Sequence, residues 1–454
     1  MWDDIGGQNG KRGLCDTIYG LPNPWPICPR LPAAVSAVLA ALHLRDPVTE
    51  GLRSLDDRQW RDALAFCDSS RLTLYPRDTL REFMPQWVRE RTDENAARNV
   101  QRLPKLEQIH STVSQRLASA DIEFVVLKGI THGSLFGGRP ENRMQSDIDL
   151  YSSHESVEAS RHLLLALGYE PVEGMDRSPT DHLPAMVGKT AWERRGDYFD
   201  LGIPTPIELH FQFWNERTER LQAPGTNEFW NRRTRRSIAG LELAVPCPAD
   251  ALAYPALHVL RHLLRGSAHP SHVYEIASIL DAHTGNDAFW SRWTSRHAPK
   301  LRRLEAVAFR LAWEWFGCRL SPVPAAEIEQ LPATTQAWFA AFATSPVRSV
   351  FDSNKDELWL HWTLLDSRRD SWSIARRRLL PGSQPLRPRN NYFPETKRTW
   401  SQWLSPSAEY VSYLLSRIVH HLLALPRTAA SGARWWWCLH GTLPPERAQP
   451  SEEE

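Results

Sequence analysis

The sequence predicts an α+β fold, in which a small mixed sheet is flanked along the chain by helical regions. Apolar residues recur at helical spacing through residues 31–119 and again through 248–426. Between them, in residues 120–247, short apolar runs alternate with helical patterns, which is typical of an α/β unit. We therefore expect a sheet-containing core between an N-terminal helical region and a C-terminal helical domain.

The composition is that of a soluble globular protein. Of the 454 residues, 42% are hydrophobic and 24% are charged, which is enough apolar material for a large core. As a prior, this length suggests two or three domains. The net charge of +1 indicates no general attraction of the whole chain to nucleic acid or membranes.

The cysteines and the apolar segments predict a cytoplasmic protein. The six cysteines are scattered without a Cys-x-x-Cys pair, which favours reduced, buried thiols. Residues 31–44 are apolar but too short to cross a bilayer, and no leader pattern is visible at the start. The cysteines are at positions 15, 28, 67, 247, 318 and 438.

The N-terminal third is predicted to be helical after an irregular lead-in over residues 1–30. One helix is expected over 33–44, and another begins near Asp57, where Asp56 or Asp57 can cap it. A long helical pattern covers 78–119, with interruptions expected at Pro85 and Pro104.

The central region is predicted to build the sheet. An apolar strand over 124–127 ends at Lys128-Gly129, where the chain must turn. The polar segment 174–200 is expected to be a mobile loop near the site. The remaining elements expected are helix 130–137, strand 147–151, helix 155–167, strand 169–173 and strand 206–213.

The C-terminal part is predicted to be helical as far as residue 426, followed by a partly disordered tail over 427–454. A basic, proline-rich stretch covers 368–403; it could contact nucleic acid or a membrane surface, but a solvated surface loop is the favoured interpretation. The predicted helices are 250–264, 272–283, 289–297, 300–316 and 408–425.

Acidic residues alternate with apolar ones in two predicted strands. Asp147 and Asp149 must share one face of their strand, because side chains alternate along a strand. Two adjacent carboxylates repel each other unless a cation lies between them, and such hard oxygen ligands suit Mg²⁺ or Mn²⁺. A third acid, Glu208, shares a face with His210 in the segment 206–211.

These residues resemble the signature of a known family. Leu127-Lys128-Gly129, Phe136, Arg143 and the segment 147–150 are similar to the motif of an uncharacterised bacterial nucleotidyltransferase family. That family belongs to the DNA polymerase beta-like nucleotidyltransferase superfamily. The segment Ile207-Glu208-Leu209-His210 resembles its next motif, and a looser similarity extends from about residue 30 to about residue 425.

The resemblance implies roles for six residues. It implies that Asp147 and Asp149 bind the metal, and that Glu208 binds a metal or acts as a base. Lys128, Gly129 and Arg143 are expected to contact the nucleotide phosphates.

Two alternative assignments stay open at this point. Glu242 and Asp200 also lie near strand-like segments and are alternatives for the third acid. Gly133-Ser134 is an alternative phosphate turn, although Lys128-Gly129 directly ends the strand and is preferred.

His258 and His262 have a spacing able to bind zinc, but without a third ligand a packing or capping role is favoured.

The resemblance implies a metal-dependent transfer of a nucleoside monophosphate from an NTP to an acceptor. The sequence does not identify the acceptor, which could be a protein, a small molecule or a nucleic acid. The alternative interpretation is a catalytically weak module that binds a nucleotide or a partner. A kinase-like use of the same site is a third interpretation.

Overall fold

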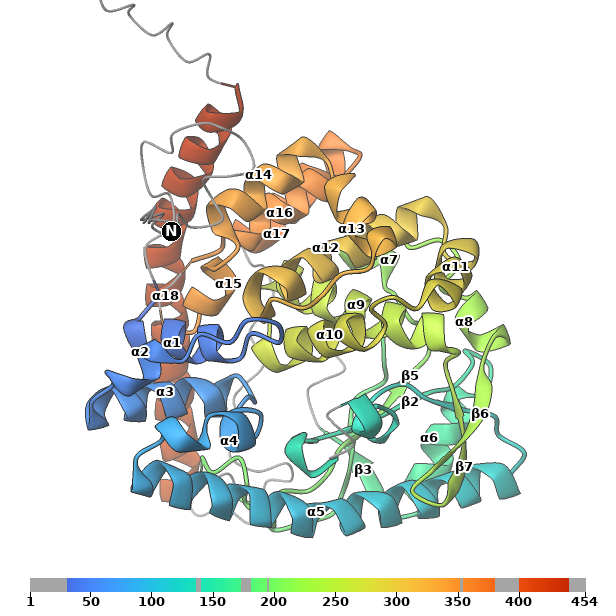
Figure 1. Ribbon diagram of the computed structural model, residues 1–454. Helices are drawn as coiled ribbons and strands as arrows, with labels where there is room; N and C mark the ends of the chain where they lie inside the picture. The colour runs from blue at the N-terminus through green and yellow to red at the C-terminus, as the bar shows by residue number, and fades with distance from the viewer. Residues whose placement is uncertain are drawn as a thin grey trace, which may run out of the picture.

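The computed structural model describes residues 31–135, 140–172, 181–193, 196–351, 354–379 and 400–440. Its elements confirm the predicted α+β class, with one small mixed sheet and helices in most of the remaining described chain (Figure 1). The sheet lies at the lower right of Figure 1, above the long helix α5, and most other helices lie above it.

The N-terminal helices follow the predicted boundaries closely. The Asp56 side chain accepts a hydrogen bond from the Gln59 amide at 2.8 Å, and the Gln59 side chain accepts one from the Asp56 amide at 2.9 Å. This capping box confirms Asp56 as the predicted cap of α3. The helices are α1 (Ala33–Ala41), α2 (Glu50–Arg53), α3 (Asp57–Ser69), α4 (Pro76–Thr79), the 3₁₀ helix η2 (Arg81–Phe83) and α5 (Gln86–Ser119).

Helix α5 does not break at Pro104, so the predicted interruption there is wrong. The helix continues for 34 residues from Pro85, which is its N-cap, to Ser119. Pro104 lies on the exposed side of the helix, where water can bond the carbonyl that proline leaves without a donor.

The five strands are ordered β1-β2-β5-β4-β3, with β2 and β5 parallel and the other neighbours antiparallel. Ile148 and Leu150 of β2 face an apolar cluster that includes α5 and α6 (Val157–Ala166). Tyr151 belongs to the core of the helical part, and Asp149 faces the same way by alternation. The strands are β1 (Val125–Val126), β2 (Ile148–Tyr151), β3 (Tyr169–Pro171), β4 (Met186–Gly188) and β5 (Ile207–His210).

Strand β4 lies inside the segment 174–200, which was predicted to be a loop, so that prediction is wrong for residues 186–188. Met186 pairs with Ile207 of β5, and Val187 pairs with Glu170 of β3. A three-residue strand between Pro184 and Gly188 has no alternation to reveal it, and its pairing partners stabilise it. Residues 173–180 and 194–195 of the predicted loop lie outside the described chain.

The connections around the sheet include one further difference from the predictions. The turn after β1 is a 3₁₀ helix, η3 (Gly129–Leu135), rather than an α-helix over 130–137; Phe136 lies outside the described residues. A hairpin formed by β6 and β7 turns at Ala239-Gly240, both at positive φ. The other elements are η4 (Pro140–Asn142), α7 (Glu216–Glu219), α8 (Glu228–Asn231), β6 (Thr234–Ile238) and β7 (Leu241–Val245).

Four C-terminal helices begin within two residues of their predicted starts, and three of these four begin with proline, whose missing N–H has no cost in the first turn. The last helix begins at Trp400 instead of the predicted residue 408. The last helix continues to His440, well beyond the predicted end at residue 425. Of the basic stretch 368–403, residues 368–379 form α17 and residues 380–399 lie outside the described chain. The helices are α9 (Pro248–Arg265), α10 (Pro270–Ala282), α11 (Asp287–Arg296), α12 (Pro299–Phe316), α13 (Pro322–Glu329), α14 (Ala333–Phe342), α15 (Ser345–Arg348), α16 (Glu357–Leu364), α17 (Arg368–Leu379) and α18 (Trp400–His440).

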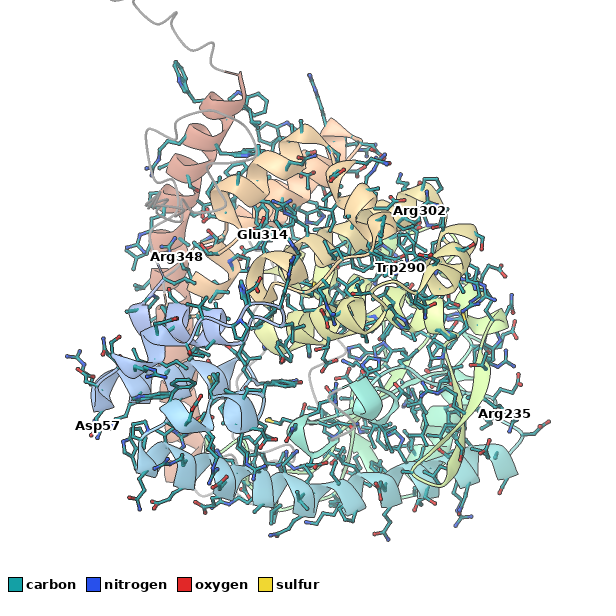
Figure 2. All side chains as sticks on the ribbon, viewed as in Figure 1. Asp57, Arg235, Trp290, Arg302, Glu314 and Arg348 are labelled. Carbon is teal, nitrogen blue, oxygen red and sulfur yellow. The ribbon has the colours of Figure 1, made fainter. Side chains whose placement is uncertain are left out.

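The N-terminal and C-terminal helices share one apolar core. Side chains from α1 and α3 belong to the same buried cluster as those from α9 to α16. Trp290 is buried in this core, whereas Asp57 and Arg235 lie at the outer edges of the molecule (Figure 2). The predicted division into separate domains stays a prediction.

Two smaller expectations can be compared with the structure. Cys67, Cys247 and Cys318 are free and buried, as expected for reduced thiols. Within the described ranges, no helix has both the length and the apolar character needed to cross a membrane.

Candidate active site

The candidate site lies where β2 and β5 run side by side. Their pairing is parallel and places Asp149 opposite Glu208, so both carboxylates point to the same face of the sheet. The Nε2 atom of His210 lies 3.1 Å from Asp149 Oδ1 and 3.7 Å from Glu208 Oε2. Possible ligand atoms of these three residues lie within 4.8 Å of one another, so the group could hold a metal ion.

Asp147 lies at the edge of this group, just before β2 and two residues before Asp149. Its side chain is half-buried, and its charge influences the pKa values of both Lys128 and Glu208. Its backbone carbonyl accepts a hydrogen bond from Gln145 Nε2 at 2.9 Å. The structure therefore places all three predicted acids at one end of the sheet.

Lys128 follows β1 directly and is buried beside the carboxylates. Its Nζ lies 3.4 Å from Asp149 Oδ2 and 3.2 Å from His258 Nε2 on α9. Burial acts to lower the pKa of Lys128, but Asp149, Asp147 and Glu208 raise it above its ordinary value. The ammonium group therefore stays charged at the end of the strand.

Gly129 allows the tight turn after Lys128. Its φ of +80° lies in the left-handed region, which glycine adopts at no steric cost. A Cβ at this position would lie 2.8 Å from Cδ of Gln145, the residue that fastens the Asp147 carbonyl. A side chain at position 129 would therefore push away the Gln145 amide, which donates to the Asp147 carbonyl.

Arg143 connects the sheet region to α10 instead of contacting the three acids. Its Nε donates to Glu275 Oε1 at 2.9 Å, and Glu275 Oε2 lies 3.4 Å from His132 Nδ1. Burial acts to raise the pKa of Glu275, but Arg143 and His132 lower it to about 2. Arg143 Nη1 is buried and has no hydrogen-bond partner among the described residues, so its predicted phosphate contact stays a prediction.

The electrostatics of the group keep the acids ionised. Burial acts to raise the pKa of Asp149, but Lys128 and the hydrogen bond from His210 lower it below its ordinary value. For Glu208 burial also raises the pKa, and His210 and His182 outweigh it. Burial acts to lower the pKa of His210, yet its hydrogen bonds to Asp149 and Glu208 and the charges of these two acids raise it above its ordinary value.

Comparisons with known proteins concern the family of the chain. A family described as uncharacterised nucleotidyltransferase matches residues 56–317, which is more than half of the chain. The chain belongs to this nucleotidyltransferase family. The predicted resemblance is thus confirmed, and a comparison with curated proteins gives no match.

One solved structure similar to this nucleotidyltransferase is described as an antigenic nucleotidyltransferase-like protein from Paracoccidioides brasiliensis. It is 18% identical, with a TM-score of 0.30, and the similarity covers 48% of this chain and 94% of the other. Family membership therefore rests on the sequence match.

Two further residues beside the candidate site were missed by the sequence predictions. Asp181 Oδ2 lies 3.3 Å from His210 Nδ1, on the opposite side of the ring from Asp149. Asp181 in turn accepts a hydrogen bond from the buried Arg261 Nη1 of α9. Asp181 lies in the predicted loop, where no sequence pattern marks it. Arg261 lies one turn from His258 on α9, and the sequence pattern predicted only that it is in a helix.

The alternatives for the third acid lie elsewhere in the nucleotidyltransferase. Glu242 is exposed on β7. Asp200 accepts hydrogen bonds from Trp192 Nε1 at 2.9 Å and from the Gly202 amide at 2.8 Å, which fixes it in its loop. Glu208 therefore remains the preferred third acid.

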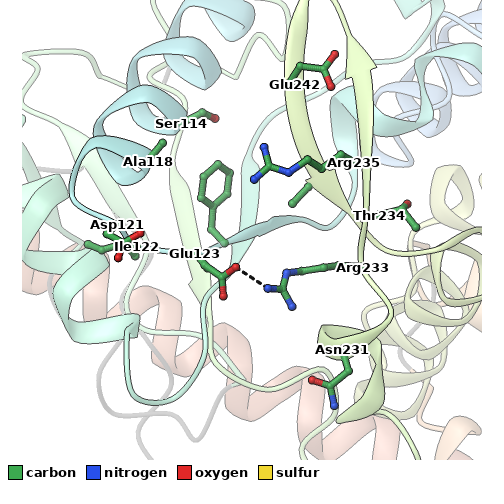
Figure 3. Close-up of a pocket in the computed structure, with 12 residues that line it drawn as sticks. Ser114, Ala118, Asp121, Ile122, Glu123, Asn231, Arg233, Thr234, Arg235 and Glu242 are labelled. Atoms are coloured by element: carbon green, nitrogen blue, oxygen red, sulfur yellow. Dashed lines mark hydrogen bonds and ion pairs between the residues drawn. The ribbon is translucent and has the colours of Figure 1, made fainter.

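A separate pocket of about 530 Å³ lies at the other end of β1. It is lined by the end of α5 and by β6 and β7, and it contains Arg235 and Glu242. Glu123 precedes β1 and forms an ion pair of 2.6 Å with Arg233 (Figure 3). Because Lys128 follows the same strand, this pocket is distinct from the carboxylate group.

Proposed function

We propose that this protein transfers a nucleoside monophosphate from an NTP to a hydroxyl-bearing acceptor and releases pyrophosphate. The supporting observation is the parallel register of Asp149 and Glu208, with the Lys128 ammonium beside them. Carboxylates that share a strand face can bind a cation, and a buried lysine at the same strand end can neutralise phosphate.

The residues present fit a divalent cation, which we propose to be Mg²⁺ or Mn²⁺. Oxygens of Asp149 and Glu208 and a nitrogen of His210 lie within 4.8 Å of one another, and Asp147 would add a third carboxylate from the segment before β2. Carboxylate oxygens are the preferred ligands of these hard ions. When bound, such an ion stabilises charge on the phosphate oxygens and makes the acceptor hydroxyl more acidic.

The protein's own groups would position the reactants and accept the proton. Glu208 is more accessible than Asp149, with 24% of its side chain exposed compared with 1%, and is proposed to face the acceptor. The acceptor hydroxyl gives its proton to Glu208 as its oxygen bonds to the α-phosphorus, while the bond from the α-phosphorus to the β-phosphate oxygen breaks. The departing electrons leave with pyrophosphate, so the step balances without a further reactant.

Lys128, Gly129 and Arg143 would hold the triphosphate. Lys128 neutralises phosphate charge, and the turn at Gly129 lets the backbone approach the phosphates closely. The unpartnered Nη1 of Arg143 supplies a further donor. The helical region 248–426, which contributes His258 and Arg261 beside the acids, is proposed to enclose the site from the side opposite the sheet.

Incubation of the protein with each labelled NTP, Mg²⁺ or Mn²⁺, and fractionated cell extract tests this function. We expect pyrophosphate release and labelling of one acceptor species. Glu208→Gln should still bind NTP but lose turnover, whereas Glu242→Gln, a control on an exposed strand, should behave like wild type. Tight NTP binding without pyrophosphate from any fraction would instead identify a nucleotide-binding module.

A further inference from the structure

Four histidines meet beside Lys128, on the helical side of the site. Ring centroids are 4.4 Å apart for His258 and His262, 4.8 Å for His258 and His272, and 5.5 Å for His269 and His272. His262 lies 5.9 Å from both His269 and His272. We call His258, His262, His269 and His272 the histidine cluster.

Hydrogen bonds connect the histidine cluster to the sheet and to solvent. Lys128 Nζ and His262 Nε2 each lie 3.2 Å from the same atom, His258 Nε2. Lys128 has no acceptor atom, so His258 Nε2 must accept, and His262 Nε2 must donate to it. His262 Nδ1 also lies 3.1 Å from the hydroxyl oxygen of the exposed Ser267. His258 is therefore neutral, and this series of contacts reaches from the buried lysine to the surface.

The surroundings of the histidine cluster are mainly cationic. Burial lowers the pKa of every member, and Lys128 lowers each of them further. Arg71 also lowers the pKa of His272 and of His269, which reaches about 4 although Asp147 acts to raise it. The groups outside the cluster whose charge acts on its pKa values are Lys128, Arg71, Arg261, Arg265, His210 and Asp147.

Helix geometry adds to this positive environment. Helix α10 begins at Pro270, directly after His269, so its positive dipole end lies at the cluster. The carbonyl end of α9 is covered, because Arg378 Nη1 donates to the Leu264 carbonyl at 2.8 Å. Three of the four rings are only half-buried, so a ligand can reach them.

A transition metal is the first ligand to consider for four neutral imidazoles. Lys128 argues against it, since its ammonium already lies 3.2 Å from His258 Nε2, the nitrogen that a metal would need. Cations repel strongly at such distances away from bulk water. The same lysine, the arginine and the imidazole N–H groups instead form a set of donors suited to an anion.

We propose that the histidine cluster, together with Lys128 and Arg71, binds the pyrophosphate end of the NTP and the pyrophosphate product. The inference rests on the proposed function for the identity of the ligand, and it adds the rings of the histidine cluster to Lys128 as the groups that hold the leaving group. Phosphate oxygens placed among these rings favour their protonated forms, so binding is accompanied by proton uptake.

The direction of the pH dependence follows from the protonation states. In the free protein the pKa values of the cluster are lowered, so the rings are neutral at pH 7. Bound phosphate raises these pKa values, so affinity increases as the pH falls. Each proton taken up strengthens binding by about tenfold per pH unit in that window.

Calorimetric titration with inorganic pyrophosphate at pH 6 and pH 8, without divalent metal, tests the proposal. The variant is His262→Gln/His272→Gln, and the matched control is His162→Gln on the exposed face of α6. At pH 6, wild type and control should bind pyrophosphate about tenfold more tightly than the double variant does. At pH 8 this difference in affinity should be smaller. The titration of pyrophosphate itself is common to all three proteins and cancels in this comparison.

Titrations in buffers with different ionisation heats give the number of protons taken up on binding. Wild type and the control should take up more protons than the double variant. Thermal unfolding establishes that each protein is folded. Equal pyrophosphate affinity in the double variant and wild type overturns the proposal. So does tight Zn²⁺ binding by wild type without pyrophosphate binding, which would make the cluster a metal site.

Failure of the two proposals can be told apart. Glu208→Gln should lose turnover yet bind pyrophosphate like wild type, because the titration involves no metal, acceptor or chemistry. If no acceptor is ever labelled but the histidine-dependent affinity is present, the phosphate site stands and the transferase function does not.

Discussion

The sheet side and the helical side of the site carry opposite chemistry. From the sheet come the carboxylates of Asp149 and Glu208, which are fixed opposite each other by backbone register. From α9 and α10 come imidazoles, surrounded by Lys128 and Arg71 and held by side-chain packing. The difference is consistent with the proposed division of tasks, in which the sheet would hold a cation and the reacting phosphorus and the helices would hold the anionic leaving group.

The two sides also differ in how firmly the sequence specifies them. An alternating acidic strand dictates its own geometry, because residues two apart must share a face. The helical side depends on how two helices pack, which no local pattern reveals. Substitutions on the sheet side should therefore reduce turnover most. Substitutions of residues that connect the two sides should mainly reduce stability.

The largest expected effect is that of Asp149→Asn on the sheet side. Loss of a metal-binding carboxylate removes several kcal/mol of transition-state stabilisation, which corresponds to a decrease in turnover of about 10³. Pyrophosphate release under saturating NTP measures it, with thermal unfolding to show that the variant is folded. Glu242→Gln is the control, and near-normal turnover of Asp149→Asn would remove this residue from the site.

Glu275→Gln tests the connection between the two sides. The pKa of Glu275 is about 2 in the folded protein against an ordinary value of 4.5, so ionised Glu275 contributes about 3 kcal/mol of stability. Because the folded pKa is lowered, this contribution is complete above pH 4.5 and is lost as the pH falls toward 2. Urea unfolding of wild type and variant should differ most at neutral pH and converge near pH 2; a constant difference would contradict the assignment.

Gly129→Ala should disturb the turn between Lys128 and the acids. The positive φ at this position costs a residue with a Cβ roughly 1–2 kcal/mol, and the contact with Gln145 moves the side-chain amide that donates to the Asp147 carbonyl. Stability should fall by about 2 kcal/mol, together with a decrease in turnover. Gly188→Ala is the matched control, since a Cβ there meets no atom within 4 Å.

The smallest effect is expected at the pocket of Figure 3. Arg233→Ala removes a partly exposed ion pair with Glu123, and such pairs contribute at most about 1 kcal/mol. Turnover should be unchanged, because the pocket lies at the other end of β1. A large loss of turnover would show that the acceptor reaches the site through this pocket.

Sequence reasoning reached the fold class and the acidic part of the site because both depend on local rules. The Asp56 cap, the glycine turn at 129 and the alternation at 147–150 each follow from the geometry of one element. It failed where tertiary pairing decides. Strand β4 exists through its partners, and Pro104 is tolerated because its side of α5 faces solvent.

The helical side shows the same limit. His258 and His262 had a visible spacing, but their meeting with His272 and Lys128 depends on the packing of α9 against α10 and the sheet. Asp181 could not be found, because a single acid in a polar segment has no period. Arg143 was predicted only to contact phosphate. Its ion pair with Glu275 could not be foreseen, because Glu275 is 132 residues away and belongs to another region.

The core shared by the first and the later helices has a consequence for synthesis on the ribosome. The Leu44 amide bonds the Phe316 carbonyl at 2.8 Å, and the Ser271 amide bonds the Ser70 carbonyl at 3.2 Å. At about 5–20 residues per second, α1 and α3 emerge roughly ten seconds to a minute before α12 can cover them. Over that interval their apolar faces are available to chaperones, while the short-range sheet can already pair. Chains stalled before α12 should therefore be cut readily by protease in α1 and α3, and become resistant once α12 has been made.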